Sequence, residues 1–190
     1  MTEIELKAHV ADPEETEKQI KTFATFRGET EKFDAYWVNP DCAKGTATGK
    51  PVKVRIREEA GVIVVTYKKK ELQGAIEVND ELEFTIDNRI AFETLITDFG
   101  FSPDSIKHKK TKSFDYVTSG NTRITIELSL VDPLGTFVEI EILKDNPDSE
   151  TIERARKILN ETLKMCGISE NAIEKRYYTE MIAEANRRER

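Results

Sequence analysis

Apolar and charged residues alternate along much of the chain with a period of two, which is typical of β-strands. At the start, Ile4 and Leu6 alternate with Glu3, Glu5 and Lys7. Similar runs predict strands at residues 32–38, in a run that begins at Pro51, and at residues 62–69, 76–86, 106–117, 122–130 and 136–143. Short turns join most neighbours, so we expect about eight strands and a largely antiparallel sheet.

Helical segments are expected near the start, the middle and the end of the chain. Asp12 can cap a helix, and Pro13 suits its first position. The expected helices run from Pro13 to about Phe26, over residues 88–99 up to Gly100, from a Ser149 cap to near Gly167, and from a Ser169 cap toward the C-terminus. Residues 39–51 hold prolines, glycines and small polar residues, which indicates a loop. The fold class is therefore predicted to be α+β.

On nearly every strand the charged residues share one face. The rows are Glu3, Glu5 and Lys7; Lys53, Arg55 and Arg57; Thr66, Lys68 and Lys70; Glu81 and Glu83; Lys110 and Lys112; Arg123 and Glu127; and Glu139 and Glu141. One interpretation is a sheet with a solvated face. The other is a closed barrel, with apolar faces turned outward to the helices and charged faces turned inward. Some strands carry mainly basic residues and others mainly acidic residues, which favours the barrel. The pattern alone leaves both interpretations open.

Composition narrows the class of protein. The 190 residues suit one domain, residues 1–190, and the net charge of −7 argues against a nucleic-acid partner. No stretch approaches the roughly 20 apolar residues that cross a bilayer, and no signal peptide is visible, so we expect no membrane partner. Cys42 and Cys166 lie far apart, which favours a reducing compartment, and we expect a cytoplasmic protein.

Charges inside a barrel must stay hydrated, pair with each other or bind a charged ligand. Carboxylates in excess suit Mg²⁺ or Mn²⁺. Lysine and arginine suit phosphate oxygens. A small triphosphorylated substrate bound together with a divalent metal would satisfy both sets.

In order along the chain, these motifs resemble the CYTH superfamily of triphosphate tunnel metalloenzymes, which includes class IV adenylyl cyclases and thiamine triphosphatases. The matching segments are Glu3-Ile4-Glu5-Leu6-Lys7, Phe33-Asp34-Ala35-Tyr36-Trp37, Arg55 with Arg57, Thr66-Tyr67-Lys68, Glu81-Leu82-Glu83, Lys110-Thr111-Lys112, Leu134-Gly135-Thr136-Phe137-Val138-Glu139-Ile140-Glu141, and Tyr177-Tyr178-Thr179-Glu180-Met181-Ile182. The chain departs from the family pattern at Lys112 (arginine), Asn79 (a basic residue), Tyr177 (serine), and Glu127 or Ser129 (aspartate).

The resemblance implies an eight-stranded, mostly antiparallel closed β-barrel, or tunnel, with helices packed outside. It implies a metal set of Glu3, Glu5, Glu127, Glu139 and Glu141, a substrate-binding set of Lys7, Arg55, Arg57, Lys68, Glu81, Glu83, Lys110, Lys112 and Arg123, and catalytic roles for Lys7, Arg55 and Glu139. The first functional hypothesis is a divalent-metal-dependent hydrolase of inorganic triphosphate, thiamine triphosphate or a nucleoside triphosphate. The alternatives are a class IV adenylyl cyclase, which makes cyclic AMP and pyrophosphate, and a non-catalytic polyphosphate binder. A homodimer is also a reasonable expectation from the resemblance.

Overall fold

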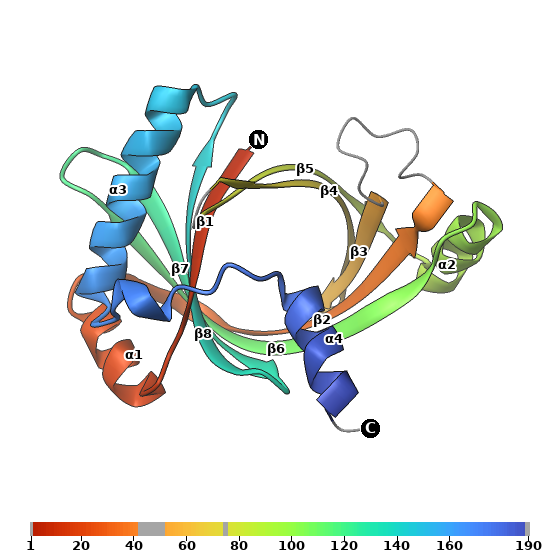
Figure 1. Ribbon diagram of the computed structural model, residues 1–190, viewed down its shortest axis with the longest axis horizontal. Coiled ribbons are helices and arrows are strands. Elements are labelled where there is room, and N and C mark those ends of the chain that lie inside the picture. The colour runs from red at the N-terminus through yellow and green to blue at the C-terminus, as the bar shows by residue number, and fades with distance from the viewer. Residues whose placement is uncertain (1, 42–51, 74–75, 189–190) are drawn as a thin grey trace.

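Eight antiparallel strands form a closed ring in the order β1-β5-β4-β3-β2-β6-β7-β8 (Figure 1). The computed structural model describes residues 2–41, 52–73 and 76–188. The strands are β1 (Thr2–His9), β2 (Thr25–Asn39), β3 (Val52–Glu59), β4 (Val62–Gln73), β5 (Ile76–Ile86), β6 (Ser102–Val117), β7 (Arg123–Asp132) and β8 (Gly135–Lys144). The helical elements are α1 (Pro13–Lys21), α2 (Arg89–Asp98), α3 (Ser149–Met165), η2 (Glu170–Ala172) and α4 (Tyr178–Arg188).

The N-terminal strand closes the ring. β1 pairs with β8 over the eight residues from Thr2 to His9. Its pairing with β5 covers only the four residues from Thr2 to Glu5. The predicted α+β barrel is confirmed, and among the described residues the seam between β1 and β5 is its shortest pairing.

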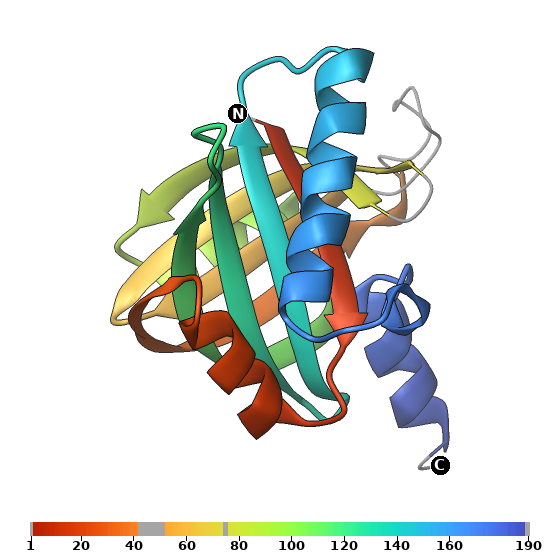
Figure 2. The ribbon, with the colours of Figure 1, turned by 90° about the vertical axis from the view of Figure 1, so that its left-hand side faces the viewer.

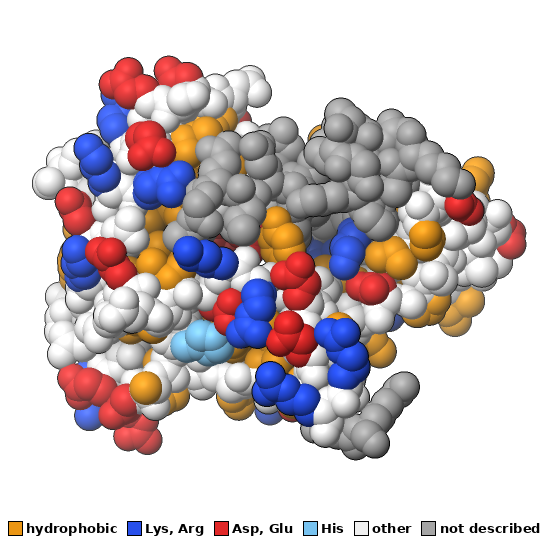
Figure 3. All heavy atoms as spheres, in the orientation of Figure 1, with side chains coloured by type: hydrophobic (Ala, Val, Ile, Leu, Met, Phe, Trp, Pro, Cys, Tyr) orange, Lys and Arg blue, Asp and Glu red, His pale blue; other side chains and the backbone are white. Residues whose placement is uncertain are grey.

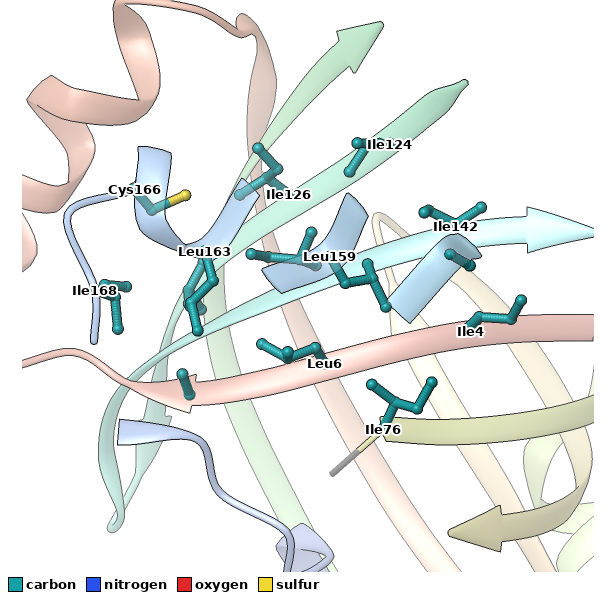
Figure 4. Close-up of a cluster of buried hydrophobic side chains, with 14 of the residues drawn as sticks. Ile4, Leu6, Ile76, Ile124, Ile126, Ile142, Leu159, Leu163, Cys166 and Ile168 are labelled. Carbon is teal, nitrogen blue, oxygen red and sulfur yellow. The ribbon is translucent and has the colours of Figure 1, made fainter. Parts of the chain in front are cut away.

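The main hydrophobic core lies outside the ring, between the strands and the helices. Ile4 and Leu6 of β1 and Ile142 of β8 face α3, whose Leu159 and Leu163 are fully buried (Figure 4). Burial of each such side chain stabilises the fold by about 1.5–3 kcal/mol. Figure 2 shows α3 running along this outer face, with α1 beside it. The charged residues that alternate with this apolar row must therefore point into the ring.

Some predicted boundaries were wrong. The first helix ends at Lys21 rather than near Phe26, because the chain from Thr25 onward pairs with β6. Strand pairing outweighs local helix propensity there. The predicted loop at residues 39–51 begins within β2 at Asn39, and its residues 42–51 lie outside the described residues.

The predicted caps of the last two helices also need correction. Asp148, not Ser149, caps α3, because its side chain accepts a hydrogen bond from the Thr151 amide at 2.8 Å. Ser169 caps only the three-residue η2, and the last helix begins at Tyr178.

The segment before α4 crosses one end of β1. Ile173 forms a β-bridge with Ala8, and the Glu174 amide donates to the Lys7 carbonyl at 2.8 Å. Acidic and basic side chains intermingle over α4 and this segment (Figure 3). The C-terminal part of the chain is thereby fixed at one end of the ring. Among the described residues, no helix is long and apolar enough to cross a membrane.

Candidate functional site

Most of the predicted site residues lie on the inner face of the ring, because their neighbours along each strand pack outside. The inward-facing members of the predicted set are Glu3, Glu5, Lys7, Arg55, Arg57, Glu81, Glu83, Glu127, Glu139 and Glu141. Arg123 is exposed at the first residue of β7. The backbone of Lys68 pairs with Glu81, but its side chain lies outside the described residues.

Strand β6 was predicted with the wrong face inward. Lys110 is 65% exposed and lies 3.6 Å from Glu31 on the outside of the ring. Lys112 also points outward and contacts Glu17 at 2.6 Å. The inward lysines of β6 are Lys107 and Lys109, which are both buried and which the sequence analysis did not select. Lysines occupy both faces of this strand, so alternation of charge carries no information about which face is inside.

This correction can be tested with a matched pair of substitutions. Lys109→Met is expected to lower the affinity for inorganic triphosphate at least about tenfold, because a buried charge-assisted contact is lost. Lys110→Met is expected to change it by less than about twofold, since an exposed ion pair contributes little. Isothermal titration calorimetry, with the melting temperature measured in parallel, compares the two. A larger loss for Lys110→Met than for Lys109→Met would mean that β6 faces the other way.

Lys109 joins two carboxylates across the interior. Its Nζ lies 2.8 Å from Glu127 and 2.7 Å from Glu139, and Lys32 Nζ lies 2.6 Å from Glu127. Burial raises the pKa of Glu127, but the charges of Lys109 and Lys32 outweigh it and lower that pKa to about 2. Burial likewise opposes ionisation of Glu139, yet Lys109 lowers its pKa. Both carboxylates are therefore ionised at neutral pH, as metal or ammonium binding requires.

Asp34 organises a second buried cluster. Its carboxylate accepts two hydrogen bonds from Arg57, at 2.7 and 3.0 Å, and lies 3.0 Å from Lys107 Nζ. Burial raises the pKa of Asp34, but Lys107 and Arg57 lower it well below its usual value. Asp34 and Lys32 were not among the site residues predicted from the sequence. They alternate with apolar Phe33 and Ala35, and this period of two was the signal that could have identified them.

Lys107 is expected to titrate near pH 8. Burial lowers the pKa of its ammonium to about 8, although the Asp34 charge acts in the opposite direction. The group is charged below that pKa, so affinity for inorganic triphosphate should fall as pH rises from about 7 to about 9. Arginine stays charged over this pH range, so the affinity of Lys107→Arg for inorganic triphosphate should fall less than that of wild type. Calorimetry across pH compares the two proteins, and an identical fall in both would contradict the assignment.

Arg55 lies on the side of the interior formed by β3, β4 and β5. Its guanidinium is 2.8 Å from Thr66 Oγ1 and 3.1 Å from Glu83. Glu81 lies 3.8 Å away, and the Thr66 hydroxyl donates to Glu83 at 2.6 Å. The two carboxylates of β5 thus orient this arginine.

Tyr178 at the start of α4 packs against the basic side chains at one end of the interior. Lys7 Nζ lies 4.5 Å and Lys107 Nζ 4.6 Å from the centre of its ring, which are distances for cation–π contacts. Thr179 Oγ1 also lies 3.4 Å from Lys53 Nζ. Burial and the nearby Glu139 charge raise the pKa of Tyr178 well above its usual value. The phenol is therefore neutral at physiological pH. The contacts of Tyr178 and Thr179 place α4 over this end of the ring.

Strand register places several inner carboxylates opposite each other. Glu5 of β1 faces Glu77 of β5 on one side and Glu141 of β8 on the other. Glu127 faces Glu139 across β7 and β8. Opposed like charges repel, so these rows favour a cation, and their all-oxygen donor set fits Mg²⁺ or Mn²⁺. Among the described residues, no three His, Cys, Asp or Glu side chains are grouped closely enough to hold a metal. Beside the pair formed by Glu127 and Glu139, the positive charge comes from the ammonium groups of Lys32 and Lys109.

A closed antiparallel barrel with apolar contacts outside and charges of both signs inside defines the class of fold. A family model described as the CYTH domain matches residues 1–178, and the chain belongs to that family. The Methanocaldococcus jannaschii protein named “Putative adenylate cyclase MJ0240” is 25% identical in an alignment of length 187, which covers 95% of this chain and 98% of that protein.

Solved structures support the same assignment. The structure of PH1819 protein from Pyrococcus horikoshii OT3 has a TM-score of 0.78 and 26% identity, and the match covers 96% of this chain and 99% of that one. “Putative adenylyl cyclase HpAC1” from Hippeastrum, described as having a dominant triphosphatase activity, matches at a TM-score of 0.59 and 16% identity, with 92% and 90% covered. At that identity the second match shows the fold alone. The resemblance stated from the motifs is confirmed.

Proposed function

We propose that the protein hydrolyses a triphosphate in a reaction that depends on a divalent metal. The observation that carries this proposal is the set of lysines and arginines held inside the ring by ionised carboxylates. Lys7, Lys107 and Lys109 are each at most 3% exposed. Keeping these charges away from water is costly, and a polyanion in the interior would compensate for that cost.

The inner side chains divide into two sets by chemistry. Lys7, Arg55, Arg57, Lys107 and Lys109 would bind and orient phosphate oxygens, and the two arginines add a planar array of donors. Mg²⁺ or Mn²⁺ would be held by pairs of carboxylates from the set Glu3, Glu5, Glu127, Glu139 and Glu141, with substrate oxygens and water completing its ligands. When bound, the metal supplies charge neutralisation and Lewis acidity. Phosphoryl transfer depends mostly on positioning and electrostatic stabilisation, so these two sets are sufficient without a protein nucleophile.

An adenylyl cyclase is the second candidate, and the name of the Methanocaldococcus relative favours it. The same inner side chains would then hold ATP so that the ribose 3′-oxygen attacks the α-phosphorus. A hydrolase instead positions water at the terminal phosphorus. A non-catalytic polyphosphate binder is a third candidate, and the number of inner carboxylates beside the bases argues against it.

Product analysis separates the three candidates. The protein is incubated with ATP, thiamine triphosphate and inorganic triphosphate, each with Mg²⁺ or Mn²⁺ and each with EDTA. Metal-dependent release of orthophosphate is the expected result. Formation of cyclic AMP and pyrophosphate from ATP would assign the cyclase. Tight binding with no product from any substrate would leave the polyphosphate binder.

A further inference from the structure

Asn79 of β5 carries a buried carboxamide that has no hydrogen-bond partner among the described residues. The residue is completely buried, and within residues 2–41, 52–73 and 76–188 no described atom pairs with its Nδ2 or its Oδ1. Ile76 and Val78 of the same strand pack in the outer core, so Asn79 shares the inner face with Glu77 and Glu81. An orphaned donor and an orphaned acceptor on one buried side chain are unusual in a folded protein.

The partner that Asn79 lacks must both donate and accept a hydrogen bond. Phosphate oxygens only accept, so they would satisfy Nδ2 and leave Oδ1 without a donor. A metal ion would satisfy only Oδ1. The cross-strand neighbour of Asn79 on β1 is Glu3, and Glu77 and Glu81 flank it two residues away on the same face. Glu77 and Glu81 are not in the proposed metal set, and their charges disfavour a phosphate at this position. On β4 its cross-strand neighbour is Lys70, whose side chain lies outside the described residues.

We infer that Asn79 recognises the organic group of the substrate through an aminopyrimidine-type edge, in which an amino group stands beside a ring nitrogen. The amino group donates to Oδ1, and the ring nitrogen accepts from Nδ2. This is the pairing that asparagine makes with the edge of adenine. The inference rests on the proposed function, and it assigns the substrate to organic triphosphates with such a ring rather than to inorganic triphosphate.

The position of Asn79 along the interior agrees with this assignment. Its neighbour Glu3 lies four residues from Lys7 on β1, which is about 13 Å along an extended strand. Lys7 is adjacent to the buried cluster around Tyr178 and Lys107. If Lys7 and Lys107 hold the phosphate chain, the organic group of the substrate would lie toward Asn79.

The test compares Asn79→Leu with Asn39→Leu. Asn39 is also buried, but its Nδ2 donates to the Phe99 carbonyl and its Oδ1 accepts from the Asp41 amide, both at 2.9 Å. Replacing an orphaned amide by an apolar group should raise the melting temperature of the ligand-free protein by about 3 °C, whereas removing the satisfied amide of Asn39 should lower it. Asn79→Leu should also reduce kcat/KM and calorimetric affinity for ATP or thiamine triphosphate at least about tenfold, with inorganic triphosphate changed less than about twofold.

Three other outcomes would contradict the proposed role of Asn79, and a fourth would contradict the proposed function. Equal losses for organic and inorganic triphosphates would place Asn79 at the phosphate or metal and overturn the ring assignment. Unchanged values for all three ligands would show that Asn79 contacts none of them. A wild-type protein that accepts only inorganic triphosphate would also overturn the inference while leaving the hydrolase proposal intact. If wild type neither binds nor converts any triphosphate, the proposed function itself fails.

Discussion

Glu139→Gln is expected to lower metal-dependent turnover by about 100-fold or more, while the protein remains folded. A metal contributes several kcal/mol to stabilising transition-state charge, and each 1.4 kcal/mol is about tenfold in rate. Glutamine keeps the size of the side chain but removes the charge from a residue that faces Lys7 of β1 and Glu127 of β7. Lys109 keeps its contact with Glu127 at 2.8 Å, so the loss in free energy of unfolding should be only about 1–3 kcal/mol.

The measurement is kcat over a range of Mg²⁺ and Mn²⁺ concentrations, with thermal unfolding followed separately. Glu170→Gln is the matched control, because Glu170 forms an exposed ion pair with Lys164 at 2.9 Å. The control should retain wild-type activity and nearly wild-type stability. Full activity of Glu139→Gln with an unchanged metal requirement would show that Glu139 does not hold the metal.

The sequence predicted the inner face correctly wherever apolar and charged residues separate cleanly. On β1, isoleucine and leucine alternate with Glu3, Glu5 and Lys7, so only one face can meet α3. Strand β5 was predicted at residues 76–86 and extends over Ile76–Ile86. The face of each strand follows from burial of apolar area, which a period of two reports directly.

The sequence did not predict residues whose placement depends on pairing between distant strands. Strand β6 carries lysines on both faces, and only its pairing with β2 and β7 turns Lys109 inward. Lys109 reaches Glu139 across 30 residues of sequence, and Arg57 reaches Asp34 across 23. Such contacts depend on register and on closure of the ring, which no local pattern contains. The orphaned carboxamide of Asn79 is likewise visible only once the side chains around it are placed.

Asp34→Asn is expected to cause the largest loss of stability among single charge-neutralising substitutions in this interior. Asp34 is 1% exposed and is held by Arg57 and Lys107. Removing its charge would leave two buried cations without their anion, which costs about 3–5 kcal/mol. Asp115→Asn is the matched control on β6, because Asp115 is partly exposed and pairs with Arg27 at 3.2 Å. The control should cost less than about 1 kcal/mol.

Acid pH provides an independent check on the cause of this loss. The folded protein holds the pKa of Asp34 well below its usual value, so its charge stabilises the fold above the unfolded pKa, about 3.9. That contribution is lost as pH falls toward the folded pKa. The difference in free energy of unfolding between wild type and Asp34→Asn, measured by urea denaturation, should therefore be constant near neutrality and shrink below about pH 4. Inorganic triphosphate should raise the melting temperature of the variant more than that of wild type, because the ligand supplies the anion that Arg57 and Lys107 have lost. A pH-independent difference without rescue by triphosphate would assign the loss to packing rather than to charge.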